Sequence, residues 1–142
     1  MSPEFERRGL QGAVALACLS PLTFGAMGIW QGPAMLAGIG PGEGAPDLLS
    51  HYRYLSGLFL AIGLTLLSCV PRIEARTQRF RWAAGAVVLG GLARLLGLAL
   101  GDAPSAPHLI GLAAELALTP ALVLWQARVA RRCALPPGRR QG

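Results

Sequence analysis

Three charged residues lie inside long apolar stretches of this sequence: Arg53, Arg94 and Glu115. A charge in the hydrocarbon interior of a bilayer costs about 3 kcal/mol or more, so such a group faces a helix bundle or a wet cavity and takes a partner there. Two kinds of chemistry suit these residue types. A guanidinium and a carboxylate can form an ion pair, and two arginines with a local surplus of positive charge can receive an anionic ligand.

The elements that position these residues are four apolar stretches, each close to the length of about 20 residues that crosses a bilayer. The chain is 53% hydrophobic and 14% charged, too few polar groups to cover a small soluble protein. We therefore predict an all-α fold, an integral membrane four-helix bundle. The predicted layout is a cytoplasmic N-terminus at 1–9, a four-span membrane domain at 10–129 with spans at about 10–30, 51–70, 81–101 and 108–126, and a basic, disordered cytoplasmic tail at 130–142.

The arginines indicate an orientation for these spans. All 13 basic residues are Arg, and eleven of them fall before the first span, between the second and third, or after the fourth. The other two connecting loops contain no Arg and carry Glu43, Asp47 and Asp102. Positive charge marks the cytoplasmic side, which predicts that both termini lie in the cytoplasm. A cleaved signal peptide is the alternative for the first span, and a retained helix is preferred because its apolar run continues to Trp30.

Depth along the helices predicts which charges meet. Arg94 lies 7 residues before Gly101, and Glu115 lies 7 residues after His108, which places both about 10 Å from the outer ends of their spans. A short loop joins the two spans, so they are expected to be antiparallel neighbours. We predict an Arg94–Glu115 ion pair. Small and polar residues on the same two helical faces support this inward placement: Gly90, Gly97 and Gly101 in the third span, and His108, Gly111, Thr119 and Gln126 in the fourth.

Several neighbours could contribute to the same intramembrane polar cluster. Arg53 lies about one turn into the second span, where it could join the pair from above or extend to lipid headgroups, and both alternatives stay open. His51, His108 and Thr119 are predicted contributors. The two histidines could approach each other at the outer helix ends, but packing or capping is the commoner role, and we predict no metal site and no cofactor. Pro120 is expected to kink the fourth span beside Glu115.

The outer loop and the possible helix pairings leave further alternatives. The Gly- and Pro-rich loop at 31–50 includes an apolar patch at 34–37, which is either a short interfacial segment or part of an ordinary loop. The pairs Gly28/Gly32 and Gly97/Gly101 have GxxxG spacing, which serves either homodimers or packing within the chain. The expected partners are the lipid bilayer and a second copy or another membrane protein. Nucleic acid is not expected, because the arginines alternate with apolar runs.

Three segments resemble a known family: residues 50–60 (SHYRYLSGLFL), residues 90–95 (GGLARL), and Glu115-Leu116 followed by Pro120 and Trp125-Gln126. With the four-span layout, the chain is similar to the uncharacterised bacterial membrane proteins grouped as domain of unknown function 4345. The resemblance covers residues from about Leu10 to Val129. It implies four helices in a bacterial cytoplasmic membrane, with Arg53, Arg94 and Glu115 as characteristic polar positions, and it implies no reaction.

Function is then a choice among three hypotheses. The sequence contains no P-loop, dinucleotide fingerprint, nucleophile elbow or HExxH motif, which favours a non-enzymatic accessory protein or small binding module. In this reading the Arg/Glu cluster in the outer half of the bilayer either fixes helix pairing or binds a ligand. The first alternative is a small transporter-like or anion- or lipid-binding protein. The second is a membrane redox or quinone-reactive component.

Overall fold

The computed structural model describes residues 2–36 and 45–134, which form helices and short turns with no strand among them. Four helical segments are long and apolar enough to cross a membrane: Pro3–Ala34, Pro46–Arg72, Thr77–Ala99 and Ala106–Ala134. The predicted all-α fold with four spans is confirmed. The elements are α1 (Pro3–Gln31), the 3₁₀ turn η1 (Gly32–Met35), α2 (Pro46–Cys69), the 3₁₀ turn η2 (Val70–Arg72), α3 (Thr77–Ala99), α4 (Ala106–Ala113), the π-helical segment η3 (Ala114–Leu118) and α5 (Thr119–Ala134).

The first and last helices extend beyond the predicted spans. The hydroxyl of Ser2 caps α1 by accepting a hydrogen bond from the Phe5 N–H, and Pro3 occupies the first turn. Helix α1 thus begins inside the predicted N-terminal segment, while α5 continues to Ala134, so residues 130–134 of the predicted tail are helical. Residues 37–44 of the outer loop and 135–142 of the tail lie outside the described residues, as does the end of the apolar patch.

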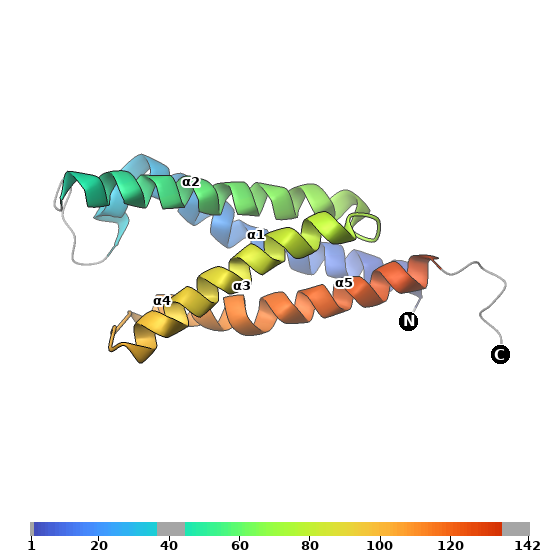
Figure 1. The fold of residues 1–142 in the computed structure, drawn as a ribbon. Helices are drawn as coiled ribbons and strands as arrows, with labels where there is room; N and C mark the ends of the chain where they lie inside the picture. The colour runs from blue at the N-terminus through green and yellow to red at the C-terminus, as the bar shows by residue number, and fades with distance from the viewer. Residues whose placement is uncertain (1, 37–44, 135–142) are drawn as a thin grey trace.

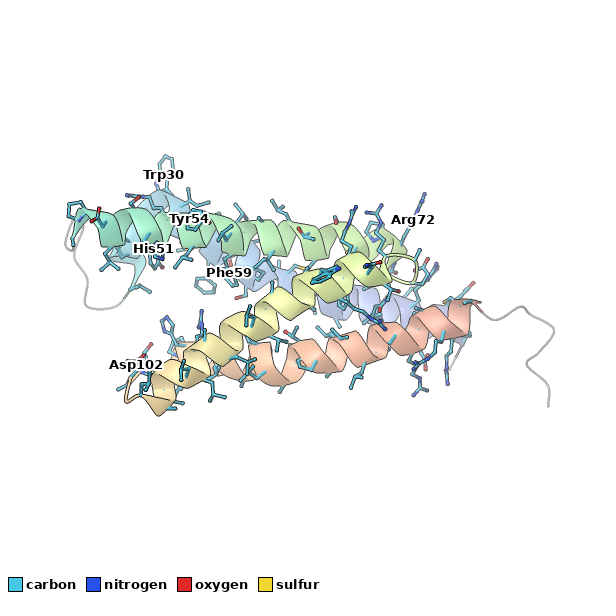
Figure 2. The ribbon with its side chains drawn as sticks, viewed as in Figure 1. Trp30, His51, Tyr54, Phe59, Arg72 and Asp102 are labelled. Carbon is cyan, nitrogen blue, oxygen red and sulfur yellow. The ribbon has the colours of Figure 1, made fainter. Side chains whose placement is uncertain are left out.

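The helices pair as two antiparallel hairpins (Figure 1). The first hairpin is α1 with α2, and the second is α3 with α4, η3 and α5. The start of α1 and the end of α5 lie at one end of the bundle, together with the turn between α2 and α3. We call this the terminal end and the opposite one the distal end. Figure 2 shows Arg72 at the terminal end, and Trp30, His51 and Asp102 toward the distal end.

The two hairpins join in the terminal half only. The core cluster consists of residues from both hairpins near this end: Leu10, Val14, Cys18, Cys69, Ile73, Phe80, Leu122 and Val129. Helix α2 packs on α3 and α1 packs on α5, whereas no described residue of α4 or η3 has its Cα within 8 Å of a Cα in α1 or α2. Figure 1 shows the hairpins diverging toward the distal end. The distal half of the second hairpin is therefore not covered by the first.

The first hairpin is held together by glycines of α1. A Cβ added at Gly25 would lie 2.8 Å from the backbone nitrogen of Leu60, so only glycine permits this approach of α1 to α2. Gly28 faces the side chain of Ser56 in the same way. The Gly28/Gly32 pair, which the sequence left open between homodimers and packing within the chain, is thus used within the chain.

Polar contacts tie the hairpins at the terminal end. The buried carboxylate of Glu6 pairs with Arg132 at 2.9 Å and with Arg128 at 3.4 Å, which joins the start of α1 to the end of α5. Arg7 pairs with Glu74 at 3.6 Å. The Glu6 pairs join the two hairpins, and the Arg7–Glu74 pair joins α1 to the turn between α2 and α3, so together they hold the terminal half closed.

Two glutamines fix the turn between α2 and α3. Gln126 is fully buried and donates hydrogen bonds to the Ile73 carbonyl at 2.9 Å and to the Thr77 hydroxyl at 2.8 Å. Gln11 donates to the Val70 carbonyl at 2.8 Å. These amides satisfy backbone carbonyls at the end of α2 and in the turn that follows it. Gln126, which the sequence placed on the same face as Glu115, thus acts at the terminal end.

Candidate functional site

Arg94 of α3 and Glu115 of η3 face each other in the distal half of the second hairpin. The Arg94 Nε atom lies 3.6 Å from the Glu115 Oε2 atom, the contact predicted from their matching depths. Their exposure differs: the Arg94 side chain is 44% exposed and the Glu115 side chain 13%. The carboxylate is therefore held between the helices, while close to half of the Arg94 side chain is exposed.

Glycines bring the two helices close enough for this contact. A Cβ added at Gly91 would lie 2.9 Å from the Glu115 Cβ and 2.8 Å from a methyl group of Leu116. Gly111 lies beside the Arg94 guanidinium, where an added Cβ would be in ordinary van der Waals contact with Nη1 at 3.5 Å. The sequence predicted that the helix face containing Gly90 would pack against the fourth span. In the structure Gly90 is exposed, and a Cβ added there meets nothing within 4 Å. The helix is rotated so that its neighbour Gly91 makes the contact.

The helix that carries Glu115 is irregular at this residue. Residues Ala114–Leu118 form a π-helical segment that ends two residues before Pro120, where the sequence predicted a kink. Proline lacks an N–H and cannot continue the α-helical ladder, which accounts for a break here. The Thr119 hydroxyl donates to the Ala114 carbonyl at 3.2 Å, so it supports the segment and does not contact the ion pair. Such π segments frequently occur at functional sites.

Arg53 lies on the first hairpin and serves a different group. Its Nε atom donates to the Ile29 carbonyl at 3.2 Å, near the end of α1. The guanidinium lies against Gly32, where an added Cβ would be 3.3 Å from Nη2. A cation is favoured at a helix C-terminus by the helix dipole and by unpaired carbonyls. Of the three residues in the predicted cluster, the structure therefore brings together two, and Arg53 caps α1 instead of joining them.

The histidines also lie apart from the ion pair. His108 is in the first turn of α4, and its Nδ1 is 3.0 Å from the hydroxyl of the N-cap residue Ser105. The His51 ring is near the ring of Tyr54, with centroids 6.1 Å apart. Among residues 2–36 and 45–134, no three His, Cys, Asp or Glu side chains form a group that could hold a metal ion.

Both Glu115 and Arg94 have hydrogen-bonding atoms that their contact with each other does not use. The Glu115 Oε2 atom is buried and has no hydrogen-bond partner among the described residues, because 3.6 Å is too long for a hydrogen bond. A guanidinium carries five N–H donors, and this one faces Glu115 through Nε. Two terminal nitrogens with four N–H groups remain for a second acceptor. The arrangement is suited to a carboxylate or phosphate that approaches from the exposed side of Arg94.

Comparison with protein families gives a match over most of the chain. The family model described as domain of unknown function (DUF4345) matches residues 9–126, a range that includes both helices of the site and both members of the ion pair. This agrees with the resemblance seen in the sequence. No curated protein and no solved structure matches the chain.

Proposed function

We propose that this chain, which belongs to the DUF4345 family, is a non-enzymatic binding module of the bacterial cytoplasmic membrane that receives an anionic group at Arg94. The protein is a multi-pass membrane protein with four apolar spans. Its ligand, in this proposal, is a membrane-soluble molecule or lipid with a carboxylate or phosphate headgroup. The headgroup would bind the terminal nitrogens of Arg94 in the distal half of the second hairpin.

The observation that carries this proposal is the exposure of Arg94. Its side chain is 44% exposed on a helix that is long and apolar enough to lie in a membrane, where a charge without a partner is costly. A pair that served only to hold α3 against η3 would be expected to bury both groups and to satisfy them with hydrogen bonds. Instead, the first hairpin leaves this surface uncovered, and the carboxylate contact is long.

Glu115 has a defined part in this proposal. In the absence of ligand it offsets the charge of Arg94 and orients its guanidinium through Nε. An incoming anion would add a second negative charge and would therefore compete with Glu115 for Arg94. Removing the carboxylate charge should strengthen anion binding, whereas removing the guanidinium should remove most of it.

A thermal-shift measurement in a neutral maltoside detergent tests this proposal. Dodecyl phosphate or dodecanoate, but not uncharged dodecanol, is expected to raise the melting temperature of the wild type by several degrees at saturation, because a ligand at about 100 times its Kd stabilises by about 2.7 kcal/mol. Arg94→Gln should remove most of the shift, and Glu115→Gln should lower the concentration needed for it. Arg53→Gln is the matched control and should keep the wild-type shift. Equal shifts in wild type and Arg94→Gln, or no shift from either anion, would refute the proposal.

We also propose that both termini lie in the cytoplasm, so that the ion pair lies in the outer half of the bilayer. The arginine asymmetry supports this orientation. Cys133 offers a native probe, because it is exposed at the terminal end while Cys18 and Cys69 are buried. A membrane-impermeant maleimide should label Cys133 only after the cells are permeabilised. Ser105→Cys, placed at the distal end in a Cys133→Ser background, should be labelled in intact spheroplasts. The reverse pattern would invert the orientation.

A further inference from the structure

A second candidate binding surface lies where α2 and α3 meet near the terminal end. An open groove of about 500 Å³ runs between these helices. Its walls are mostly apolar and include Leu58, Ala61, Ile62 and Thr65 of α2, with Arg79 and Trp82 of α3 toward the terminal end. This surface shares no residue with the Arg94 site.

The terminal end of the groove carries uncompensated positive charge. Arg79 is exposed, and its Nη1 atom lies 3.4 Å from the Ser68 hydroxyl. It forms no ion pair with a carboxylate in the described part of the chain. The nearest acidic residue in sequence, Glu74, is already paired with Arg7. A negatively charged group at this position would therefore complement Arg79.

The groove runs along α2 in the direction of the bilayer normal. Its outermost α2 residues, Leu58 and Thr65, are seven residues apart, or about 10 Å along the helix axis. Half of the hydrocarbon thickness of a bilayer is about 15 Å, so the groove covers much of the depth of one leaflet. Trp82 is 75% exposed beside Arg79, and tryptophan is enriched at the level of the headgroups. The groove thus combines an interfacial cation and indole with an apolar path toward the bilayer centre.

We infer that this groove binds one acyl chain of an anionic phospholipid, with the lipid phosphate at Arg79. Basic pockets between membrane helices bind anionic headgroups through such contacts. A zwitterionic lipid would place its own cation near Arg79, so the site should discriminate between headgroups. The inference goes beyond the proposed function, because it concerns other helix faces and the opposite leaflet.

Native mass spectrometry of the protein released from neutral detergent tests the inference. With equimolar palmitoyl-oleoyl phosphatidylglycerol and phosphatidylcholine added, the wild type should retain phosphatidylglycerol in preference. Arg79→Gln should reduce that retention about tenfold, whereas Arg131→Gln, which removes an exposed arginine of α5 at the same end, should not. Ala61→Phe, which fills the groove and keeps Arg79, should also reduce it.

Each variant has an outcome that would overturn the inference. Equal retention of the two lipids by the wild type would exclude headgroup recognition. An equal effect of Arg79→Gln and Arg131→Gln would show that only general surface charge is involved. Full retention by Ala61→Phe with an unchanged melting temperature would show that the acyl chain lies elsewhere. Since Arg94→Gln leaves this groove intact, it should retain phosphatidylglycerol even if the proposed ligand at Arg94 fails to bind.

Discussion

Replacing Gly91 with leucine is expected to lower the free energy of unfolding by about 2 kcal/mol or more, a large effect for an overpacking substitution. A Cβ at this position would already lie 2.8 Å from a Leu116 methyl group and 2.9 Å from the Glu115 Cβ. The longer leucine side chain would separate α3 from η3. Because that separation moves Glu115 away from Arg94, the carboxylate should compete less with an anion, and the variant should respond to dodecyl phosphate at a lower concentration than the wild type, as expected for Glu115→Gln.

The adjacent glycine provides a matched control for this prediction. Gly90 lies on the same helix, is exposed, and has nothing within 4 Å of an added Cβ. Gly90→Leu should therefore leave stability unchanged or raise it slightly, since leucine is the better helix former. Equilibrium unfolding in mixed dodecyl sulfate and maltoside micelles would compare the two. Similar losses in both variants would mean that Gly91 is not a helix contact.

Exchanging the charges of the ion pair is expected to give the second large effect. Arg94→Glu and Glu115→Arg should each destabilise the protein by about 2 kcal/mol, because each leaves two like charges between α3 and η3. This value is lower than for a fully buried pair, since the Arg94 side chain is 44% exposed. The double variant Arg94→Glu/Glu115→Arg should recover at least half of the summed loss, as measured by a double-mutant cycle.

Arg53 supplies the control for the charge exchange. It donates to the Ile29 carbonyl and lies on the first hairpin, so it should show no coupling to Glu115. Arg53→Glu combined with Glu115→Arg should have the sum of the two single effects. If the loss of stability in the Arg94→Glu/Glu115→Arg variant equals the sum of the losses in its two single variants, the two residues do not interact energetically.

The sequence was sufficient to predict the four spans and the contact between Arg94 and Glu115. Hydrophobic length identifies a membrane helix because the bilayer sets a minimum span. The short loop between the third and fourth predicted spans forces them to be neighbours. The equal distances of seven residues from Arg94 to Gly101 and from His108 to Glu115 then place the two side chains at similar depth. These arguments use only local length and connectivity, which one sequence provides.

Helix rotation could not be predicted with the same certainty. Successive residues in an α-helix differ by about 100° in direction, so the choice between Gly90 and Gly91 decides which face of α3 meets η3. Both glycines are adjacent in the sequence, and only the packing against Leu116 distinguishes them. The π-helical segment adds to the difficulty, because its extra residue shifts the register of Glu115 relative to regular helical spacing.

Contacts that depend on distant segments or on backbone atoms were also missed. Glu6 and Arg132 lie 126 residues apart, and Glu6 precedes the predicted first span, so no spacing argument connects them. Arg53 donates to a backbone carbonyl. Every residue has such a carbonyl, so the sequence does not show which one accepts the hydrogen bond. The sequence left open whether Arg53 joins the ion pair or extends to lipid headgroups, and the contact with the Ile29 carbonyl was neither of these alternatives.

The central claim is that Arg94, while it is paired with Glu115, can still receive an anion. Side-chain ¹H–¹⁵N NMR of the arginine guanidinium groups in neutral detergent micelles tests this claim most directly. Arg94→Lys would identify the Arg94 Nε signal by its disappearance. We predict that titration with dodecyl phosphate shifts this signal in a saturable manner, that the Arg53 signal does not move, and that dodecyl maltoside has no such effect. An Arg94 signal that stays unchanged at saturating dodecyl phosphate would contradict the claim and leave the ion pair with a structural role alone.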